Sequence, residues 1–566
     1  MKYRLIIKSL SSCLLLFLCI ATSTISGQTY KAGPQVLSFY SGVDDTEQPY
    51  ALYLPKNYEE GKKYPFVVML HGAGSNHRLA LKRVFGKSNK EGETDVEASR
   101  YFPDWKDRDY IVASPFARGT MGYQGIAEQD VLDMINDVKS RFSVDENRTY
   151  LTGLSMGGGG TLWMGLSYPD MWAAIAPVCP APPAGTEAKL ANAYNFPVHF
   201  FQGGADPVVP AAGTQKWVEN MKQAGINVKY EEYPGVQHDS WVPAYEGGEV
   251  FDWFDKFVRN PNPIHVKFST GTYQHNKAYW VQIDAFPPNS TGKLDAKFVD
   301  QNRIEVKTSS LLGFTLDLSN HPKFSNRKGV FLTIDGMPVK AKADSGKISV
   351  MKEGKRWIKG TPNSEAPFSK RQGEEGPMTA AIMDRHVYVY GTADNPSEEV
   401  LQTRKTAAEK AANWSFYRGE FMGRIMVFPR VLTDKQVRPS DLKEANLILF
   451  GDKNTNAVIQ QLSDELPIEL NDGSEELGLA YIYPRKGNYV LVNSGLSIFD
   501  APDSKKQLGA WVRFSAPPML YALMKFDDYV LFDKERVLTE GFFDNTWQLS
   551  DQSKEVFLKT GQVSIK

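Results

Sequence analysis

The stretch TGLSMGGGG, residues Thr152–Gly160, contains the pattern Gly-x-Ser-x-Gly centred on Ser155. This pattern is typical of a serine at a sharp turn between a strand and a helix. Glycines on both sides of it let the backbone fold back and leave the hydroxyl exposed. Residues 148–152 predict the strand and residues 161–167 the helix. The stretch therefore predicts a nucleophilic serine. A phosphate-binding loop is the alternative, but the stretch lacks the lysine that a P-loop carries.

Strands and helices alternate on both sides of this turn. Several strands are continuous apolar runs, as expected for strands buried on both faces. We expect strands at 48–55, 64–70, 109–114, 172–177, 198–201 and 228–233, and helices at 127–142, 214–224 and 250–258. This order predicts an α/β fold, with a mostly parallel sheet and helices on both of its faces.

A serine hydroxyl needs a base to take its proton and a carboxylate to orient that base. In a sheet of this kind the expected chain order is serine, acid, histidine. Asp206 follows one predicted strand in the turn GGAD, and His238 follows the next strand in GVQHD. The carboxyl ends of parallel strands meet at one edge of the sheet, so we predict that Ser155, Asp206 and His238 act together. The alternatives are a turn aspartate and a surface histidine.

The tetrahedral intermediate of such a reaction carries an oxyanion, which backbone N–H groups stabilise. One donor is expected from Met156, directly after the serine. The other is expected from the loop His71–Gly74, where Gly72 and Ala73 are the candidates. An ordinary turn at a strand end is the alternative for this loop.

Three further side chains lie on predicted loops that could line an acyl or sugar site: Trp241, Arg118 and Tyr123. Packing or surface exposure is the alternative for each of them. The spacing of the histidines shows no metal-binding motif, so we expect no metal and no cofactor.

Residues 35–260 resemble the α/β-hydrolase superfamily, and within it the secreted esterases of the feruloyl-esterase, polyhydroxybutyrate-depolymerase and predicted-peptidase group. The likeness rests on HGAG at 71–74, GLSMGG at 153–158 with GGT at 159–161, and the turns around Asp206 and His238. Many members carry a cysteine pair near the oxyanion loop, which this domain lacks.

The resemblance implies a serine esterase that works through an acyl-enzyme without a cofactor. Acetyl or feruloyl groups on polysaccharides are the implied substrates. One alternative is a peptidase similar to the prolyl-oligopeptidase group. Those peptidases usually carry a propeller before the hydrolase domain, whereas here the extra chain follows it. The second alternative is a carbohydrate-binding protein whose hydrolase domain is inactive, which the intact order of Ser155, Asp206 and His238 disfavours.

With 566 residues the chain is long enough for two or three domains. We expect an α/β-hydrolase domain at 28–262, a β-rich unit at 263–344 and a mixed α/β accessory domain at 345–566. Residues 345–377 are polar and glycine-rich, which predicts a long loop. The formal net charge of -1 gives no overall field that would favour nucleic acid or an anionic membrane.

The first residues have the pattern of a signal peptide at 1–27. Lys2, Arg4 and Lys8 form a basic start, an apolar run includes residues 14–18, and small residues at 21–27 offer a cleavage zone. The apolar run is too short and wrongly flanked for a membrane span. We therefore expect export to the periplasm or the exterior of a bacterium.

Two of the three cysteines, Cys13 and Cys19, lie inside this signal. Cys19 allows a lipid anchor as an alternative, but Leu18 is bulky where such sites usually carry a small residue. The third cysteine, Cys179, lies in an apolar stretch and is expected in the core. The exported chain would then have no intrachain disulfide.

Overall fold

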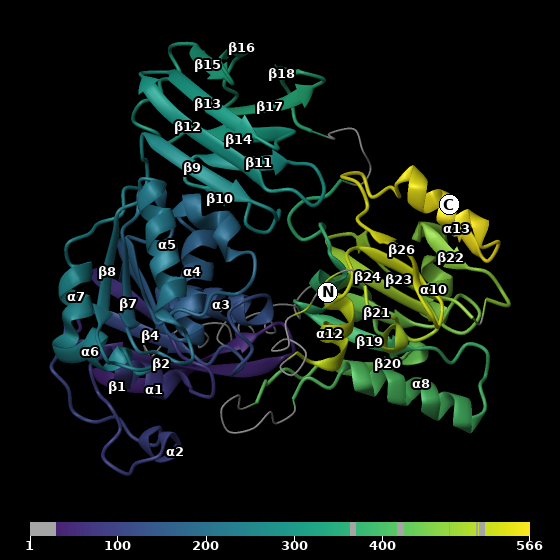
Figure 1. The fold of residues 1–566 in the computed structure, drawn as a ribbon, viewed down its shortest axis with the longest axis horizontal. Helices are drawn as coiled ribbons and strands as arrows, with labels where there is room; N and C mark the ends of the chain where they lie inside the picture. The colour runs from purple at the N-terminus through teal and green to yellow at the C-terminus, as the bar shows by residue number, and fades with distance from the viewer. Residues whose placement is uncertain are drawn as a thin grey trace, which may run out of the picture.

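The computed structural model describes residues 30–362, 369–415, 424–474, 476–504, 506, 508 and 516–566. The predicted signal peptide at 1–27, with Cys13 and Cys19, lies outside these residues. The described chain forms an N-terminal α/β domain, a β-sandwich and a C-terminal α/β domain (Figure 1). Among the described residues, no helix is both long and apolar enough to cross a membrane.

The N-terminal domain is built on one eight-stranded sheet. Its strands are β1 (Gly33–Ser41), β2 (Thr46–Leu54), β3 (Tyr64–Leu70), β4 (Ile111–Pro115), β5 (Val144–Leu154), β6 (Ala174–Val178), β7 (Val198–Gly203) and β8 (Val228–Tyr233). Their order is β1-β2-β4-β3-β5-β6-β7-β8. Strands β3 to β8 pair in parallel, while β2 is antiparallel to both of its neighbours. The predicted mostly parallel sheet is confirmed.

Helices cover both faces of this sheet, because the central strands are apolar on both sides; every residue of β3 is buried. One apolar core includes residues of α3 (Ile126–Arg141), α4 (Met156–Ser167) and α5 (Ala211–Gln223). The core on the opposite face includes residues of α1 (His77–Val84), α6 (Trp241–Tyr245) and α7 (Glu249–Phe254). Three short helical segments complete the described part of the domain: α2 (Asp95–Ala98), η1 (Thr186–Asn195) and η2 (Glu246–Gly248).

The next unit is a sandwich of two five-stranded sheets around one shared core. Its strands are β9 (His265–Thr270), β10 (Lys277–Ala278), β11 (Val281–Ala285), β12 (Gly292–Asp300), β13 (Arg303–Ser309), β14 (Gly313–Asp317), β15 (Val330–Ile334), β16 (Met337–Ala341), β17 (Lys347–Glu353) and β18 (Arg356–Lys359). One sheet has the order β10-β11-β14-β17-β18 and the other β16-β15-β13-β12-β9. The β-rich character predicted for this region is confirmed.

Strands β17 and β18 correct the prediction of a long loop at 345–377. They extend the sandwich to Lys359, beyond residue 344, where the sequence analysis placed its end. Ile348 and Val350 alternate with partly or fully exposed residues and are completely buried in the sandwich core. Because the surrounding composition is polar and glycine-rich, this short alternation gave too weak a signal. Residues 363–368 of the same stretch lie outside the described chain.

The C-terminal domain has a mixed seven-stranded sheet, in agreement with the mixed α/β prediction. Its strands are β19 (His386–Tyr390), β20 (Arg430–Thr433), β21 (Asn446–Phe450), β23 (Gly478–Arg485), β24 (Asn488–Gly495), β25 (Tyr529–Phe532) and β26 (Val537–Gly541), in the order β20-β19-β21-β24-β23-β25-β26. A separate pair joins β22 (Ile468–Leu470) to β27 (Val563–Ile565). The α-helices of this domain, among the residues that the structure describes, are α8 (Glu398–Ala411), α9 (Pro439–Glu444), α10 (Ala457–Leu462), α12 (Pro518–Met524) and α13 (Asp551–Lys559).

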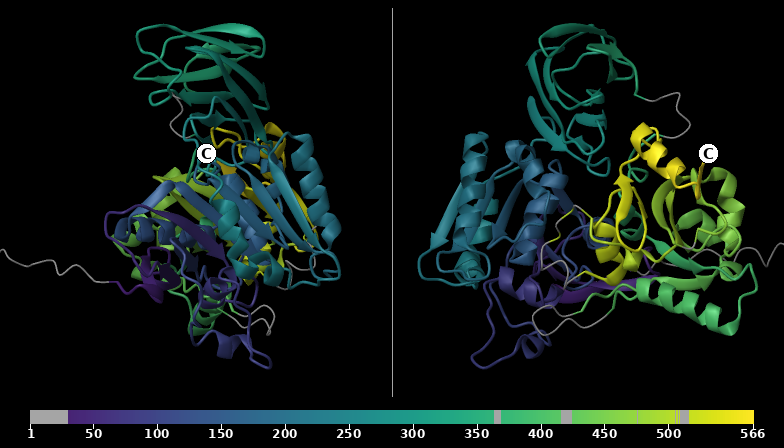
Figure 2. Two further views of the ribbon diagram at one scale, coloured as in Figure 1. Left: turned by 90° about the vertical axis from the view of Figure 1, so that its left-hand side faces the viewer. Right: turned by 45° about the vertical axis from the view of Figure 1, so that its right-hand side comes forward.

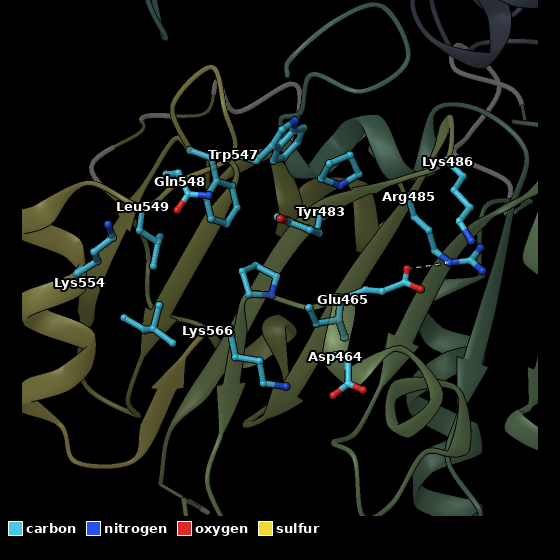
Figure 3. Close-up of a pocket in the computed structure, with 15 residues that line it drawn as sticks. Asp464, Glu465, Tyr483, Arg485, Lys486, Trp547, Gln548, Leu549, Lys554 and Lys566 are labelled. Atoms are coloured by element: carbon cyan, nitrogen blue, oxygen red, sulfur yellow. Dashed lines mark ion pairs between the residues drawn. The ribbon is translucent and has the colours of Figure 1, made fainter. Parts of the chain in front are cut away.

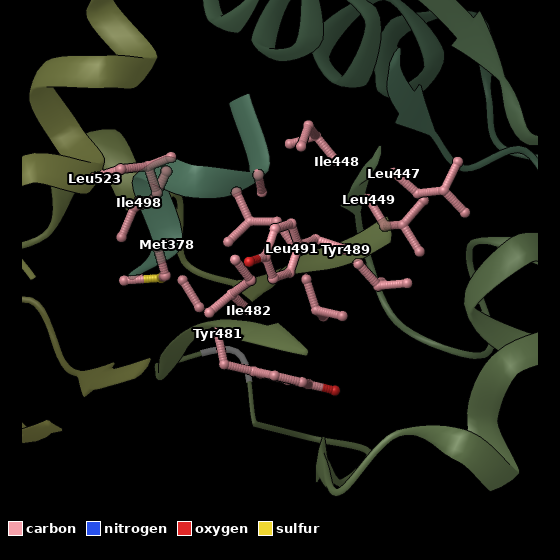
Figure 4. Packing of buried hydrophobic residues seen from close by; sticks show 14 of the residues in the cluster. Met378, Leu447, Ile448, Leu449, Tyr481, Ile482, Tyr489, Leu491, Ile498 and Leu523 are labelled. Carbon is pink, nitrogen blue, oxygen red and sulfur yellow. The ribbon is translucent and has the colours of Figure 1, made fainter. Parts of the chain in front are cut away.

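The core of this domain continues into the N-terminal domain. Figure 4 shows its centre, where side chains from β21, β23 and β24 meet Met378, Ile498 and Leu523. The same cluster contains Val43 and Ile126, which belong to the N-terminal domain. The two α/β domains therefore share buried apolar surface, and the right-hand view of Figure 2 shows them side by side below the sandwich.

Candidate active site

Ser155 stands alone between the last residue of β5 and the first residue of α4. Its φ of 56° and ψ of -116° lie outside the regions that residues with a side chain prefer. A Cβ on Gly157 would lie 2.2 Å from the backbone oxygen of Leu70, so only glycine fits where α4 crosses β3. This sharp turn is the one that the sequence predicts.

His238 and Asp206 approach Ser155 from the ends of the neighbouring strands. His238 Nε2 lies 2.9 Å from Ser155 Oγ, and its Nδ1 lies 2.8 Å from Asp206 Oδ2. Asp206 is in the turn after β7 and His238 in the loop after β8. The structure thus brings the three predicted residues into one hydrogen-bonded chain. Ser155 and Asp206 are buried, whereas the His238 side chain is half-buried.

The carboxylate of Asp206 is held on every side. Its Oδ1 accepts hydrogen bonds from the backbone N–H groups of Val208 and Val209, at 2.8 and 2.9 Å. Its Oδ2 accepts from Gln202 Nε2 at 3.3 Å as well as from His238. Asp206 is therefore fixed in the orientation that receives the Nδ1–H of His238, which leaves Nε2 free to accept the serine proton.

Gln202 is a contributor that the sequence analysis missed. It is fully buried, donates to the backbone oxygen of Val209 at 2.9 Å, and accepts from Thr214 Oγ1 at 2.8 Å. These contacts aim its amide at Asp206. The available signal was a glutamine near the end of the largely apolar strand VHFFQG.

The loop His71–Gly74 lies directly against the serine turn. A Cβ on Gly72 would lie 2.8 Å from Leu154 Cδ1 and 3.6 Å from Ser155 Cβ, so the loop backbone passes very close to the serine. Met156 is the first residue of α4, and the first N–H groups of a helix have no acceptor within it. The predicted donors Met156, Gly72 and Ala73 therefore belong to two segments that meet beside Ser155.

His71 anchors this loop from the inside. Its Nδ1 and Nε2 lie 2.8 Å from the backbone oxygens of Gly72 and Phe116, respectively. Burial lowers the pKa of His71, which favours the neutral ring with a single N–H. The single N–H of the neutral imidazole can donate to only one of these two backbone oxygens, that of Gly72 or that of Phe116.

Two predictions about substrate-lining residues are wrong. Arg118 is fully buried, and its guanidinium pairs with Asp44 and Asp130, each at 2.6 Å. Tyr123 is buried too, and its hydroxyl donates to the backbone oxygen of His71 at 2.9 Å. Both side chains point inward because each finds its polar partners there.

Trp241, which the sequence analysis placed on a loop, is the first residue of α6. Its ring is half-buried and packs edge-on against His238, with 5.6 Å between the ring centroids. It lines an open hollow of about 590 Å³ together with His238, Val236 and Val242. Trp241 therefore remains a candidate contact for a substrate at the histidine.

Cys179 completes a group of three potential metal ligands with Asp206 and His238, whose ligand atoms lie within 4.8 Å of one another. Burial raises the pKa of the Cys179 thiol to about 12, and only a thiolate is a good metal ligand. Asp206 and His238 already bond to each other. These donors fit a proton relay better than a metal centre, and Cys179 is a core residue as predicted.

A separate cavity of about 660 Å³ lies in the C-terminal domain (Figure 3). Tyr483, Phe543 and Trp547 contribute its aromatic part, and Arg485 and Lys566 are among its charged residues. All of its lining residues lie between 464 and 566, so this cavity takes no part in the arrangement around Ser155.

Comparison with known proteins shows which family the domain around Ser155 matches. Residues 44–244 match the model of a family described as putative esterase. This domain is an esterase-family α/β-hydrolase. Over 84 residues the chain is 37% identical to a poly(3-hydroxybutyrate) depolymerase of Ralstonia pickettii, and the match covers 14% of this chain and 16% of that relative. The match to the esterase family ends at residue 244, before the sandwich begins.

Solved structures of esterases also align with part of the chain. A thermostable esterase is 27% identical, with 40% of this chain and 63% of the other covered and a TM-score of 0.34. A ferulic acid esterase of Anaeromyces mucronatus is 19% identical, with 39% and 90% covered and a TM-score of 0.29. These alignments leave more than half of this chain uncovered.

Proposed function

We propose that this protein is an exported serine esterase that removes acyl groups, such as acetyl or feruloyl, from polysaccharides. The observation that carries the proposal is the hydrogen-bonded chain of Ser155, His238 and Asp206 inside an esterase-family domain. In a serine esterase the histidine contacts the serine through one ring nitrogen and the carboxylate through the other, as these three residues do.

In the proposed reaction His238 Nε2 takes the proton of Ser155 while Oγ attacks the ester carbonyl carbon. The oxyanion of the tetrahedral intermediate receives the N–H of Met156 and that of Gly72 or Ala73. His238 then protonates the leaving alcohol as the C–O bond breaks, and the acyl group stays on Ser155. Water, deprotonated by His238, attacks this acyl-enzyme. His238 then returns the proton to Ser155 Oγ as the bond between Oγ and the acyl carbon breaks, and the acid is released. Asp206 stabilises the charged imidazole in both halves of the reaction.

The choice of substrate rests on the resemblance to secreted feruloyl esterases and on the shape around His238. The hollow beside His238 is open, which suits an acyl group presented on a polymer. Trp241 offers an aromatic face for a sugar or a feruloyl ring. The pattern at residues 1–27 would bring the protein to extracellular polymers.

The test is hydrolysis of an aryl acetate, an aryl ferulate, an acetylated xylan and poly(3-hydroxybutyrate) by the protein and by its Ser155→Ala variant. Ser140→Ala, an exposed serine on α3 of the same domain, is the matched control. We expect Ser155→Ala to lose at least about 10³-fold in kcat on whichever ester is used, because the nucleophile is gone. Ser140→Ala should remain active.

Activity that survives in Ser155→Ala would contradict the assignment of the nucleophile. Hydrolysis of peptides but of none of these esters would favour the peptidase alternative. The preferred ester among the four identifies the acyl group and the polymer.

A further inference from the structure

The loop from Phe116 to Gly125, here called the clamp loop, connects β4 to α3 and holds the oxyanion loop His71–Gly74. Thr120 Oγ1 accepts the backbone N–H of Gly74 at 2.9 Å. The Tyr123 hydroxyl donates to the backbone oxygen of His71 at 2.9 Å. These two bonds tie both ends of the oxyanion loop to the clamp loop, and the His71 ring packs beside them with its Nε2 2.8 Å from the backbone oxygen of Phe116.

The other side of the clamp loop pairs with the C-terminal domain. Met426 donates its backbone N–H to the backbone oxygen of Arg118 at 3.1 Å, and Gly119 forms an antiparallel bridge with Ile425. A Cβ on Gly119 would lie 2.3 Å from the backbone oxygen of Arg424. Residues 424–426 of the C-terminal domain therefore lie against the clamp loop and pair with it through an isolated bridge and a backbone hydrogen bond.

Arg118 is the centre of this junction. Its side chain is fully buried, and all five N–H groups of the guanidinium have an acceptor. Nε and Nη2 donate to Asp130, and Nη2 donates to Ser41 as well. Nη1 donates to Asp44 at 2.6 Å and to the backbone oxygen of Met426 at 3.2 Å. The guanidinium thus joins β1, α3 and the C-terminal domain in one set of bonds.

The backbone of the clamp loop depends on these contacts. Ala117 and Arg118 have φ values of 45° and 61°, although neither is glycine. Two successive residues in the left-handed region are unfavourable for a free loop, and such conformations persist when the surrounding contacts hold them. Removal of the C-terminal contacts should therefore release the loop that supports Thr120 and Tyr123.

We propose that the C-terminal domain holds the oxyanion loop of the esterase domain in its working position through the clamp loop, with Arg118 as the central positioning residue. This inference rests on the proposed esterase function, because it gives the C-terminal domain a role in the same site. An oxyanion is stabilised by donors that are fixed before the reaction. Looser donors reduce stabilisation of the transition state more than binding of the ester, so kcat should fall while KM changes little.

The experiment uses the full-length protein and two pairs of matched variants. Met426→Pro removes the backbone N–H that donates to the backbone oxygen of Arg118, whereas Met426→Ala keeps this hydrogen bond. Thr120→Val removes the acceptor of the Gly74 N–H, whereas Thr120→Ser keeps it. Arg385→Gln breaks a different interdomain ion pair, that of Arg385 with Asp45 at 2.6 Å, and serves as a control for domain docking.

Two readouts are measured on each variant: kcat and KM on an aryl ester, and hydrogen exchange of the peptide that contains residues 71–74. We expect Met426→Pro and Thr120→Val to lose about tenfold or more in kcat, with KM within about twofold, and to exchange faster at residues 71–74. Met426→Ala, Thr120→Ser and Arg385→Gln should stay within about threefold of the original kcat, with unchanged exchange. If Met426→Pro does not fold, Arg118→Lys replaces it, since lysine lacks the fork that reaches Asp44 and Met426 together.

Unchanged exchange at residues 71–74 in a folded Met426→Pro or Arg118→Lys variant would overturn the proposal. An equal loss of kcat in Arg385→Gln would overturn it too, since domain docking in general would then be responsible. If the unmodified protein hydrolyses no ester while exchange still rises in Met426→Pro, the esterase function fails and the mechanical link between the domains stands.

Discussion

At the scale of single residues, the site is ordered before any substrate arrives. Asp206 accepts hydrogen bonds from the N–H groups of Val208 and Val209 and from Gln202, in addition to the one from His238. These bonds leave the carboxylate one useful orientation, and that orientation selects the tautomer of His238 whose Nε2 faces Ser155. The orientation of Asp206 thus depends on two backbone N–H groups and one buried side-chain amide, and a sequence motif contains none of these contacts.

The role of Asp206 predicts the effect of Asp206→Asn. An amide would present its NH₂ group to His238 Nδ1 and favour the tautomer that cannot accept the serine proton. We therefore expect kcat to fall by about 10³–10⁴-fold with the fold intact. Asp239→Asn, at the exposed carboxylate next to His238, is the control and should cost little. Steady-state kinetics on an aryl ester measure both, and a larger loss in Asp239→Asn would reverse the assignment of the acid.

At the scale of elements, the sequence predicts well wherever a pattern reports burial or a backbone requirement. Continuous apolar runs identify β3, β4 and β6, because strands buried on both faces carry no polar alternation. The glycines around Ser155 identify the turn, since the crossing of α4 over β3 leaves no space for a Cβ on Gly157. The carboxyl ends of parallel strands lie at one edge of the sheet, so the sequence also predicts that Asp206 and His238 lie near Ser155.

The sequence predicts poorly where the outcome depends on what a loop side chain faces. Arg118 and Tyr123 are polar residues on a loop, and nothing in the neighbouring sequence indicates that they are buried. Their partners in the interior are Asp44 and Asp130 for Arg118, and the backbone oxygen of His71 for Tyr123. The partners of Arg118 come from β1, α3 and the C-terminal domain, and only the tertiary fold brings these together. The short strands β17 and β18 were missed for a related reason, because a few buried residues in a polar stretch give little periodicity.

At the scale of the whole molecule, buried polar and charged groups join the N-terminal domain, the sandwich and the segment that follows the sandwich. Glu128 of α3 bonds to His275, from the segment between β9 and β10 of the sandwich, at 2.6 Å; both side chains are buried. Lys189 of η1 lies 2.7 Å from the other ring nitrogen of His275. Glu375, which follows the sandwich in the chain, accepts the backbone N–H groups of Tyr273 and Gln274 beside them. A buried polar network of this kind fixes one arrangement of the domains, since each group depends on its partners.

Glu375 gives this junction a predictable pH dependence. Burial raises the pKa of its carboxyl group from 4.5 to about 7. Between these values the folded protein holds a proton that the unfolded chain releases, so the free energy of unfolding falls as the pH rises through this window. Glu375→Gln removes the titration. The stability of the unmodified protein relative to this variant should therefore drop between pH 5 and pH 8, by up to about 3 kcal/mol.

Denaturant unfolding of both proteins at the two pH values measures this difference. Exposed Glu399→Gln on α8 is the control, which should follow the unmodified protein at both values. The assignment of a raised pKa to Glu375 would be contradicted if the unmodified protein, compared with Glu375→Gln, were equally stable at both pH values or relatively more stable at pH 8.

The central claim is that Ser155 is an activated nucleophile, and covalent labelling tests it most directly. A fluorophosphonate reacts with an activated serine hydroxyl and adds one phosphonyl group, and peptide mapping by mass spectrometry locates it. The account predicts one adduct, on the peptide that contains Ser155, that is absent from Ser155→Ala and forms far more slowly in His238→Ala, where the base is missing. An adduct on another serine, or labelling that persists in Ser155→Ala, would contradict it.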